Sequence, residues 1–205
     1  MHVRDAPMSH VWYVSYGSNL YADRFACYLR GGVPVGAAHA YPGCRDGSPP
    51  RAVREVEAPG GIYFATRSPV WGGGRAFFDP GLPGTAAMRG YLITTGQFAD
   101  VVEQEMYREP GPEIDLTTVL AEGRDQRGPG RYDTLLRLGE FAGHPALTFT
   151  APWSAGDVEH TAPSGPYLKM LRDGLCESHG WTTARAAAYL AGRTTFWTGP
   201  EVERL

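Results

Sequence analysis

Near the start of the sequence, an apolar strand-like run stops abruptly at a small polar turn and is followed by a helix. Val11 to Val14 are β-branched or aromatic residues, which are typical of a buried strand. The turn contains Gly17, and glycine can adopt a positive φ and lets a ligand approach the backbone closely. Tyr21 to Arg30 has apolar residues at helical spacing. Backbone N–H groups of residues 17 to 20 are therefore expected near the positive end of a helix, a geometry that favours anions.

The length and composition predict a single domain. With 205 residues, of which 42% are hydrophobic, the chain can bury one substantial core, and no long polar linker divides it. We therefore expect one domain over residues 1–205, with an extended C-terminal tail from about residue 192.

The charge pattern favours a small-molecule partner. A net charge of -3 with scattered Lys and Arg gives no basic stripe, so neither nucleic acid nor a membrane surface is expected as a partner. The run at Val11 to Val14 is too short to cross a bilayer, and the residues before it show no charged segment followed by an apolar one, so no signal peptide is expected. The expected location is cytoplasmic, with the protein a monomer or homodimer.

Cysteine usage and motif content narrow the chemistry. Cys27, Cys44 and Cys176 are widely spaced and odd in number, which predicts free thiols and no CxxC metal or redox site. Phosphate-binding loops, GxGxxG, HExxH and GxSxG are all absent from the sequence. No cofactor and no metal are expected, so the chemistry falls to carboxylates or hydroxyls.

Further along the chain, strand-like segments precede helical ones. Gly31 to Gly60 is predicted to be mostly loop, with one strand near Val33 to Ala40. The other predicted strands are Gly61–Thr66, Arg75–Phe78, Met88–Thr94, Arg131–Leu138 and Ala146–Phe149, and the later helices are Tyr167–Cys176 and Thr182–Leu190. This order predicts an α+β fold with a mixed, curled sheet rather than alternating βαβ units.

One more helix is predicted from Gln97 to Tyr107. Its apolar residues, Phe98, Val101, Val102 and Met106, fall at helical spacing. Glu103 and Gln104 are expected on another face, whereas Glu105 lies beside the apolar stripe.

Four segments together resemble the γ-glutamylcyclotransferase-like proteins, a group that includes AIG2-type proteins. They are Tyr16-Gly17-Ser18-Asn19-Leu20 after the first strand, Ser68 to Gly74, Val102-Glu103-Gln104-Glu105, and Pro163 to Tyr167. They occur in the family's order and span most of the chain. The resemblance implies a small barrel-like sheet flanked by helices.

The resemblance also implies a reaction and the residues that perform it. It places Glu105 as the general acid/base that cyclises a γ-glutamyl amine or peptide to 5-oxoproline and releases the amine, with no metal required. It also implies a set of substrate-binding residues: Tyr16, Gly17, Ser18, Asn19, Leu20, Trp71, Gly72, Gly73 and Tyr167.

The residues alone leave alternatives open. On the residues alone, Glu105 is more typical of a solvated helix position, Glu103 and Glu109 are competing carboxylates, and both glycine turns suit ordinary loops. Met106 and Tyr107 stand where the family usually has Gly and a small apolar residue. A related acyl-amide hydrolase or transferase, or a non-catalytic binding module, therefore remains an alternative function. Arg45, Arg51 or Arg54 is a candidate for recognising an additional carboxylate.

Overall fold

A computed structural model describes residues 9–34 and 40–205 of the chain. Most of the strand predicted near Val33 to Ala40 lies outside these residues, and within them only an isolated bridge joins Gly32 to Tyr41.

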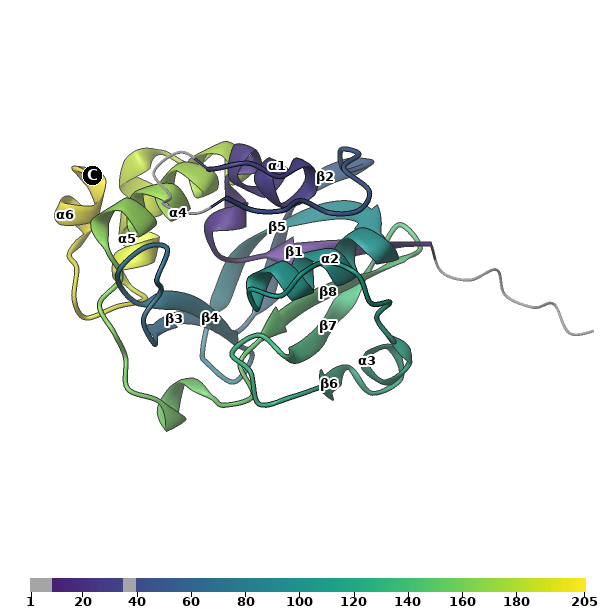
Figure 1. The fold of residues 1–205 in the computed structure, drawn as a ribbon. Helices are drawn as coiled ribbons and strands as arrows, with labels where there is room; N and C mark the ends of the chain where they lie inside the picture. Colours follow the sequence, from purple (N-terminus) through teal and green to yellow (C-terminus); the bar gives the residue numbers. More distant parts are fainter. Residues whose placement is uncertain (1–8, 35–39) are drawn as a thin grey trace, which may run out of the picture.

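The main sheet has six strands in the order β2-β5-β1-β8-β7-β6 (Figure 1). Central β1 pairs antiparallel with β5 and parallel with β8, so the sheet is mixed. The predicted α+β class with a mixed, curled sheet flanked by helices is confirmed, although the sheet stays open at β2 and β6. The strand bounds are β1 His10–Ser15, β2 Ala52–Pro59, β5 Thr85–Thr94, β6 Arg124–Gln126, β7 Thr134–Phe141 and β8 His144–Thr150.

A separate antiparallel hairpin, β3 (Gly61–Ala65) and β4 (Arg75–Asp79), packs near the end of β8. The Thr150 hydroxyl donates to the carbonyl oxygen of Phe78 at 2.6 Å and accepts from its N–H at 3.2 Å. One side chain thus satisfies both backbone groups at the point where the hairpin meets the main sheet.

Helices cover both faces of β1. Val11 and Tyr13 belong to a core cluster shared with α1 (Ala22–Arg30) and α2 (Thr95–Glu105), whereas Trp12 and Val14 face α4 (Gly165–His179) and α5 (Thr183–Ala191). Because successive strand residues point to opposite faces, burial on both sides explains why β1 is apolar throughout. The remaining elements are η1 Ser18–Leu20, α3 Thr117–Glu122, η2 Ala155–Asp157 and α6 Gly199–Glu203.

The C-terminal segment folds back onto this second face. In α6, Val202 is fully buried, and its carbonyl oxygen accepts a hydrogen bond from Arg172 of α4 at 3.1 Å. The residues after 192 therefore lead through turns and bends into a packed helix (Figure 1).

Helix α2 is well defined at both ends. Thr94 and Gln97 form a reciprocal capping box at its start. The predicted helix continues to Tyr107, but α2 ends at Glu105 because Tyr107 adopts a φ of 57°, which a right-handed helix does not allow. Glu105 is thereby the last residue of the helix.

Several elements were not expected from the sequence, among them β2, α3 and β6. β2 occupies part of the predicted loop Gly31 to Gly60, where Val56 and Ala58 point inward and the charged residues Arg54, Glu55 and Glu57 face solvent. Such charges are common on edge strands, and they hide the apolar alternation. α3 and β6 have too few residues to show a periodic pattern.

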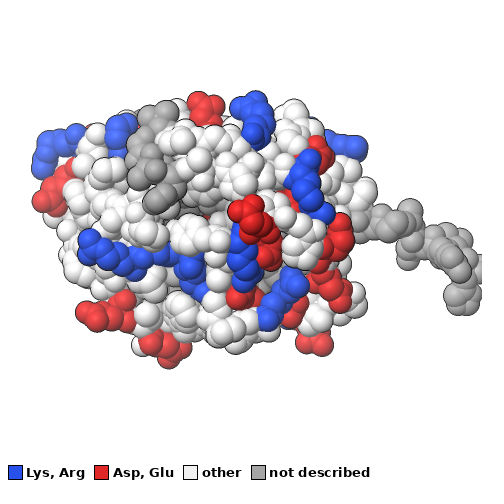
Figure 2. Space-filling view, in the orientation of Figure 1, with Lys and Arg blue, Asp and Glu red and all other residues white. Residues whose placement is uncertain are grey.

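The structure also shows the hydropathy of the helices, the state of the cysteines and the distribution of charge on one face. Over the described ranges, no helix has both the length and the apolar composition needed to span a membrane. All three cysteines are free, as predicted. On the face shown in Figure 2, acidic and basic side chains are interspersed.

Candidate active site

The turn after β1 presents unused backbone donors. It forms a single 3-10 turn in which the Leu20 N–H bonds to the Gly17 carbonyl oxygen at 2.9 Å. Among the described residues, no hydrogen bond uses the N–H groups of Gly17, Ser18 and Asn19. These donors precede α1 rather than forming its first turn, so three of the four predicted N–H groups remain available.

Gly17 is placed differently from the expectation. Its φ is -107°, so no positive φ is needed there. A Cβ at this position would lie 3.4 Å from the Tyr167 hydroxyl oxygen, which is an ordinary contact distance. The turn and the start of α4 are therefore close neighbours at Gly17.

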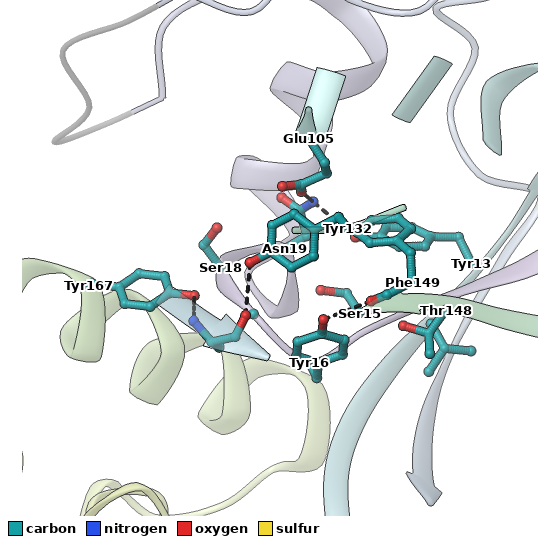
Figure 3. A pocket seen from close by; sticks show the side chains of 13 residues that line it. Tyr13, Ser15, Tyr16, Ser18, Asn19, Glu105, Tyr132, Thr148, Phe149 and Tyr167 are labelled. Atoms are coloured by element: carbon teal, nitrogen blue, oxygen red, sulfur yellow. Dashed lines mark hydrogen bonds between the residues drawn. The ribbon is translucent and has the colours of Figure 1, made fainter. Parts of the chain in front are cut away.

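Glu105 lies in the same cavity as this turn (Figure 3). The cavity has a volume of about 40 Å³, enough for a group the size of a carboxylate. Glu105 Oε1 is 3.4 Å from Asn19 Nδ2, a long contact, and the same nitrogen donates to the Tyr13 hydroxyl oxygen at 3.2 Å. The half-buried carboxyl group is thus held only loosely.

The surroundings of Glu105 change its proton affinity. Burial raises the pKa of this carboxyl group above its ordinary value, while the nearby Tyr28 hydroxyl and the cations of Arg24, Arg131 and Arg75 partly oppose the rise. A raised pKa brings the carboxyl group closer to the range in which one group can both accept and donate a proton.

The tyrosine hydroxyls around the cavity differ in whether their protons are already used in hydrogen bonds within the protein. Tyr132 donates to the Ala76 carbonyl oxygen at 2.8 Å, and Tyr16 donates to that of Phe149 at 2.7 Å, so both protons are used. The Tyr167 hydroxyl instead accepts the Ala76 N–H at 3.1 Å. Its proton is therefore available to a ligand.

A second cavity of about 40 Å³ adjoins the first. The two share Ser18, Glu105, Tyr132 and Tyr167, so the carboxyl group of Glu105 lies at their boundary. The second cavity is also lined by Arg24, Arg75 and Trp71, together with Tyr28 and Tyr41. We call it the arginine cavity, and the first the loop cavity.

The structure brings together some of the predicted site residues. The loop cavity is lined by Tyr16, Gly17, Ser18, Asn19, Glu105 and Tyr167, and Trp71 lines the arginine cavity. Their functional roles remain predictions. They come from β1 and the turn after it, the end of α2, the loop before β4, and the start of α4.

Three predicted residues lie elsewhere. Leu20 is 1% exposed and packs in the core, with its N–H already bonded. Gly72 is exposed with a φ of 78°, and Gly73 is packed so tightly against residues 162–164 that a Cβ would lie 2.7 Å from the backbone. In this structure both glycines shape a turn rather than the cavity wall.

The arginines proposed from sequence are not in either cavity. Arg45 pairs with Asp100 at 3.0 Å, and the Arg54 guanidinium lies 4.1 Å from the centre of the Phe141 ring. Sequence reasoning missed Arg24 and Arg75. A signal for Arg24 was present, because it shares the apolar helical face of Phe25 and Tyr28.

The described residues contain no group of three or more His, Cys, Asp or Glu side chains arranged to hold a metal ion. The donors that the cavities do offer are N–H groups, hydroxyls and guanidinium groups, all of which suit an anionic organic ligand.

Comparison with known proteins defines the fold. No family model matches the chain. A solved structure of a gamma-glutamyl cyclotransferase superposes on 95% of this chain and 96% of its own, with a TM-score of 0.50 and 16% sequence identity. The chain has the gamma-glutamyl cyclotransferase fold. An uncharacterised protein from Homo sapiens gives a TM-score of 0.48 at 16% identity, with the same coverage.

The chain is also similar in sequence to part of a longer protein whose name differs from those of the structural neighbours. Over 198 residues the chain is 33% identical to histone deacetylase 5 of Arabidopsis thaliana, in a match covering 88% of this chain. The chain spans only 30% of the length of that relative.

Proposed function

We propose that this protein is a γ-glutamylcyclotransferase-type enzyme that converts a γ-glutamyl amine or peptide to 5-oxoproline and a free amine. One observation carries the proposal: Glu105 lines the same cavity as residues 17–19, whose backbone N–H groups are unused. The gamma-glutamyl cyclotransferase fold supports it. We further propose that the protein acts in the cytoplasm on a small molecule, as a monomer or homodimer.

In the proposed reaction, the α-amine of the glutamyl group attacks its own γ-carbonyl carbon. A new C–N bond closes the five-membered ring, and the bond to the departing amine breaks. Glu105 accepts the proton that the attacking amine loses and delivers it to the departing nitrogen. Because both reacting atoms belong to one molecule, the cavity's main task is to hold the folded conformer.

The N–H groups of Gly17, Ser18 and Asn19 would stabilise negative charge on the substrate, either its α-carboxylate or the oxygen of the tetrahedral intermediate. The free Tyr167 proton adds one more donor close to Gly17. These groups are fixed by the fold before substrate binds, so they need little reorganisation during the reaction.

The test is to incubate the purified protein with a panel of γ-glutamyl amines and dipeptides and to quantify 5-oxoproline by mass spectrometry. Wild type and Glu103→Gln should form it, because Glu103 pairs with Arg108 outside both cavities, whereas Glu105→Gln should not. Unchanged turnover in Glu105→Gln would refute the assigned role. Release of glutamate in place of 5-oxoproline would instead indicate the related hydrolase, and ligand-induced stabilisation without any product would indicate a binding module.

A further inference from the structure

Two arginines of the arginine cavity are buried and have no acidic partner in contact among the residues that the structure describes. Arg24 is 3% exposed and Arg75 is 8% exposed. Within the described part of the chain, Nε and Nη1 of Arg24 and Nε of Arg75 have no hydrogen-bond partner. Neither arginine takes part in any ion pair between described residues.

The groups around these arginines compensate their charge incompletely. The Arg24 guanidinium lies 4.9 Å and 4.4 Å from the ring centres of Tyr28 and Tyr41, and it donates to the Tyr41 hydroxyl. Arg75 donates to the carbonyl oxygen of Arg67. Aromatic faces and neutral oxygens are weaker partners than a carboxylate, and a buried cation without one is costly.

Glu105 is the acidic side chain that lines this cavity, and it does not balance both arginines. Its one negative charge faces the two positive charges of Arg24 and Arg75, and Arg131 adds a third cation nearby. The cavity therefore retains positive charge whether or not Glu105 is protonated. An anion the size of a carboxylate fits its volume and supplies the missing partner.

The position of the arginine cavity shows which part of a substrate would reach it. It meets the loop cavity at Glu105, Ser18, Tyr132 and Tyr167, which line both. Through Tyr41, Val70 and Tyr107 it adjoins a larger surface hollow of about 370 Å³. A glutamyl group held in the loop cavity would direct its departing amine past Glu105 towards Arg24 and Arg75.

We propose that Arg24 and Arg75 form a second anion-binding subsite, which takes a carboxylate on the amine half of the substrate. The favoured leaving group is then an amine that carries a carboxylate, such as an amino acid, rather than an amine without a negative charge. The identity of the leaving group rests on the proposed function, but the subsite itself is a property of the cavity.

The first test uses a matched pair of substrates, γ-glutamyl-alanine and its C-terminal amide, which differ only in the charge on the leaving group. Wild type should prefer the acid, and Arg75→Gln should lower the acid-to-amide ratio of kcat/KM about tenfold or more, because a charge-assisted hydrogen bond is lost. Arg75→Lys should restore part of the ratio. Arg54→Gln, at an exposed site outside the cavities, should leave the ratio as in wild type. An equal effect of Arg75→Gln on both substrates would overturn the assignment to the amine half.

The second test does not depend on turnover. Sodium acetate should raise the melting temperature of wild type above that in sodium chloride of equal ionic strength, and the rise should be smaller in Arg75→Gln but not in Arg54→Gln. If neither substrate reacts while this pattern holds, the proposed reaction fails and the subsite stands. If both substrates react equally well and acetate has no specific effect, the reaction stands and the subsite is overturned.

Discussion

Helix α2 carries Asp100 at its middle and Glu105 at its end, and the two carboxylates lie in different surroundings. The Asp100 side chain is 1% exposed and accepts from Arg45 twice, from Nε at 3.0 Å and from the backbone N–H at 2.9 Å. Glu105 accepts one long hydrogen bond, 3.4 Å from Asn19 Nδ2, and the Tyr28 hydroxyl lies nearby. A carboxylate whose lone pairs are occupied stabilises the fold, whereas one left with free lone pairs in a cavity is available for chemistry.

The geometry of the helix separates the two environments. Five residues correspond to about 140° of rotation, so Asp100 faces the segment at Arg45 while Glu105 faces the turn after β1. Glu105 also ends the helix, where the negative end of the dipole disfavours a carboxylate. The Arg131 guanidinium caps the Glu105 carbonyl oxygen at 2.7 Å rather than its carboxyl group.

The largest expected contrast is in turnover. Replacing Glu105 by Gln should reduce kcat for 5-oxoproline formation by about 10²- to 10⁴-fold, the usual contribution of a general acid/base. Asp100→Asn, assayed at a temperature where it stays folded, should retain most of its turnover because Asp100 lines neither cavity. If both variants lost turnover to a similar extent, the distinction between a catalytic Glu105 and a structural Asp100 would be wrong.

The next contrast is in stability. Replacing Arg45 and replacing Asp100, the two partners of one ion pair, should lower the free energy of unfolding by different amounts. Arg45→Gln leaves a buried carboxylate without its cation and should cost about 2 kcal/mol. Asp100→Asn should cost about 1 kcal/mol, because the Arg45 side chain is 44% exposed and water can solvate it. Urea unfolding at neutral pH measures both values. A larger cost for Asp100→Asn would show that the burial argument assigns the penalty to the wrong partner.

Much of the fold was accessible from the sequence because its strongest elements are locally consistent. β1 is apolar throughout, α2 has both a periodic stripe and a capping box, and α4 begins at a Ser cap. β2 could not be predicted from the sequence, because its charged residues are not typical of a strand. It forms a strand through its pairing with β5. The end of α2 was misplaced because Tyr107 tolerates a positive φ, which its residue type disfavours.

Part of the candidate site could also be predicted from the sequence, but for a different reason. Glu105 and the turn after β1 came from the family resemblance, since nothing in the local sequence relates two segments 86 positions apart. Arg24 and Arg75 were missed because the absence of a partner carboxylate is a property of the packed structure. Arg45 was a candidate only until the structure showed its pairing with Asp100.

A third contrast concerns two hydroxyls that bond to the same residue. Tyr132 donates to the Ala76 carbonyl oxygen and Tyr167 accepts from its N–H, so removing either should cost about 1 kcal/mol of stability. Only the Tyr167 proton is free for a ligand, so Tyr167→Phe should lower kcat/KM about tenfold and Tyr132→Phe much less. Steady-state kinetics and thermal unfolding of the two variants separate these effects. Equal kinetic losses would mean that the hydroxyls only position β4.

The smallest expected effect returns to Glu105 and concerns how stability varies with pH. Because its pKa is raised above the ordinary value of 4.5, the folded state binds this proton more tightly than the unfolded state does. The stability this gives is fully present below pH 4.5 and is lost as the pH rises through the folded-state pKa. Glu105→Gln cannot titrate, so its melting temperature relative to wild type should rise between pH 4 and pH 8. If the difference instead fell over this range, Arg24, Arg75 and Arg131 would be outweighing burial, and the loosely held carboxyl group would be a counter-ion rather than an acid/base.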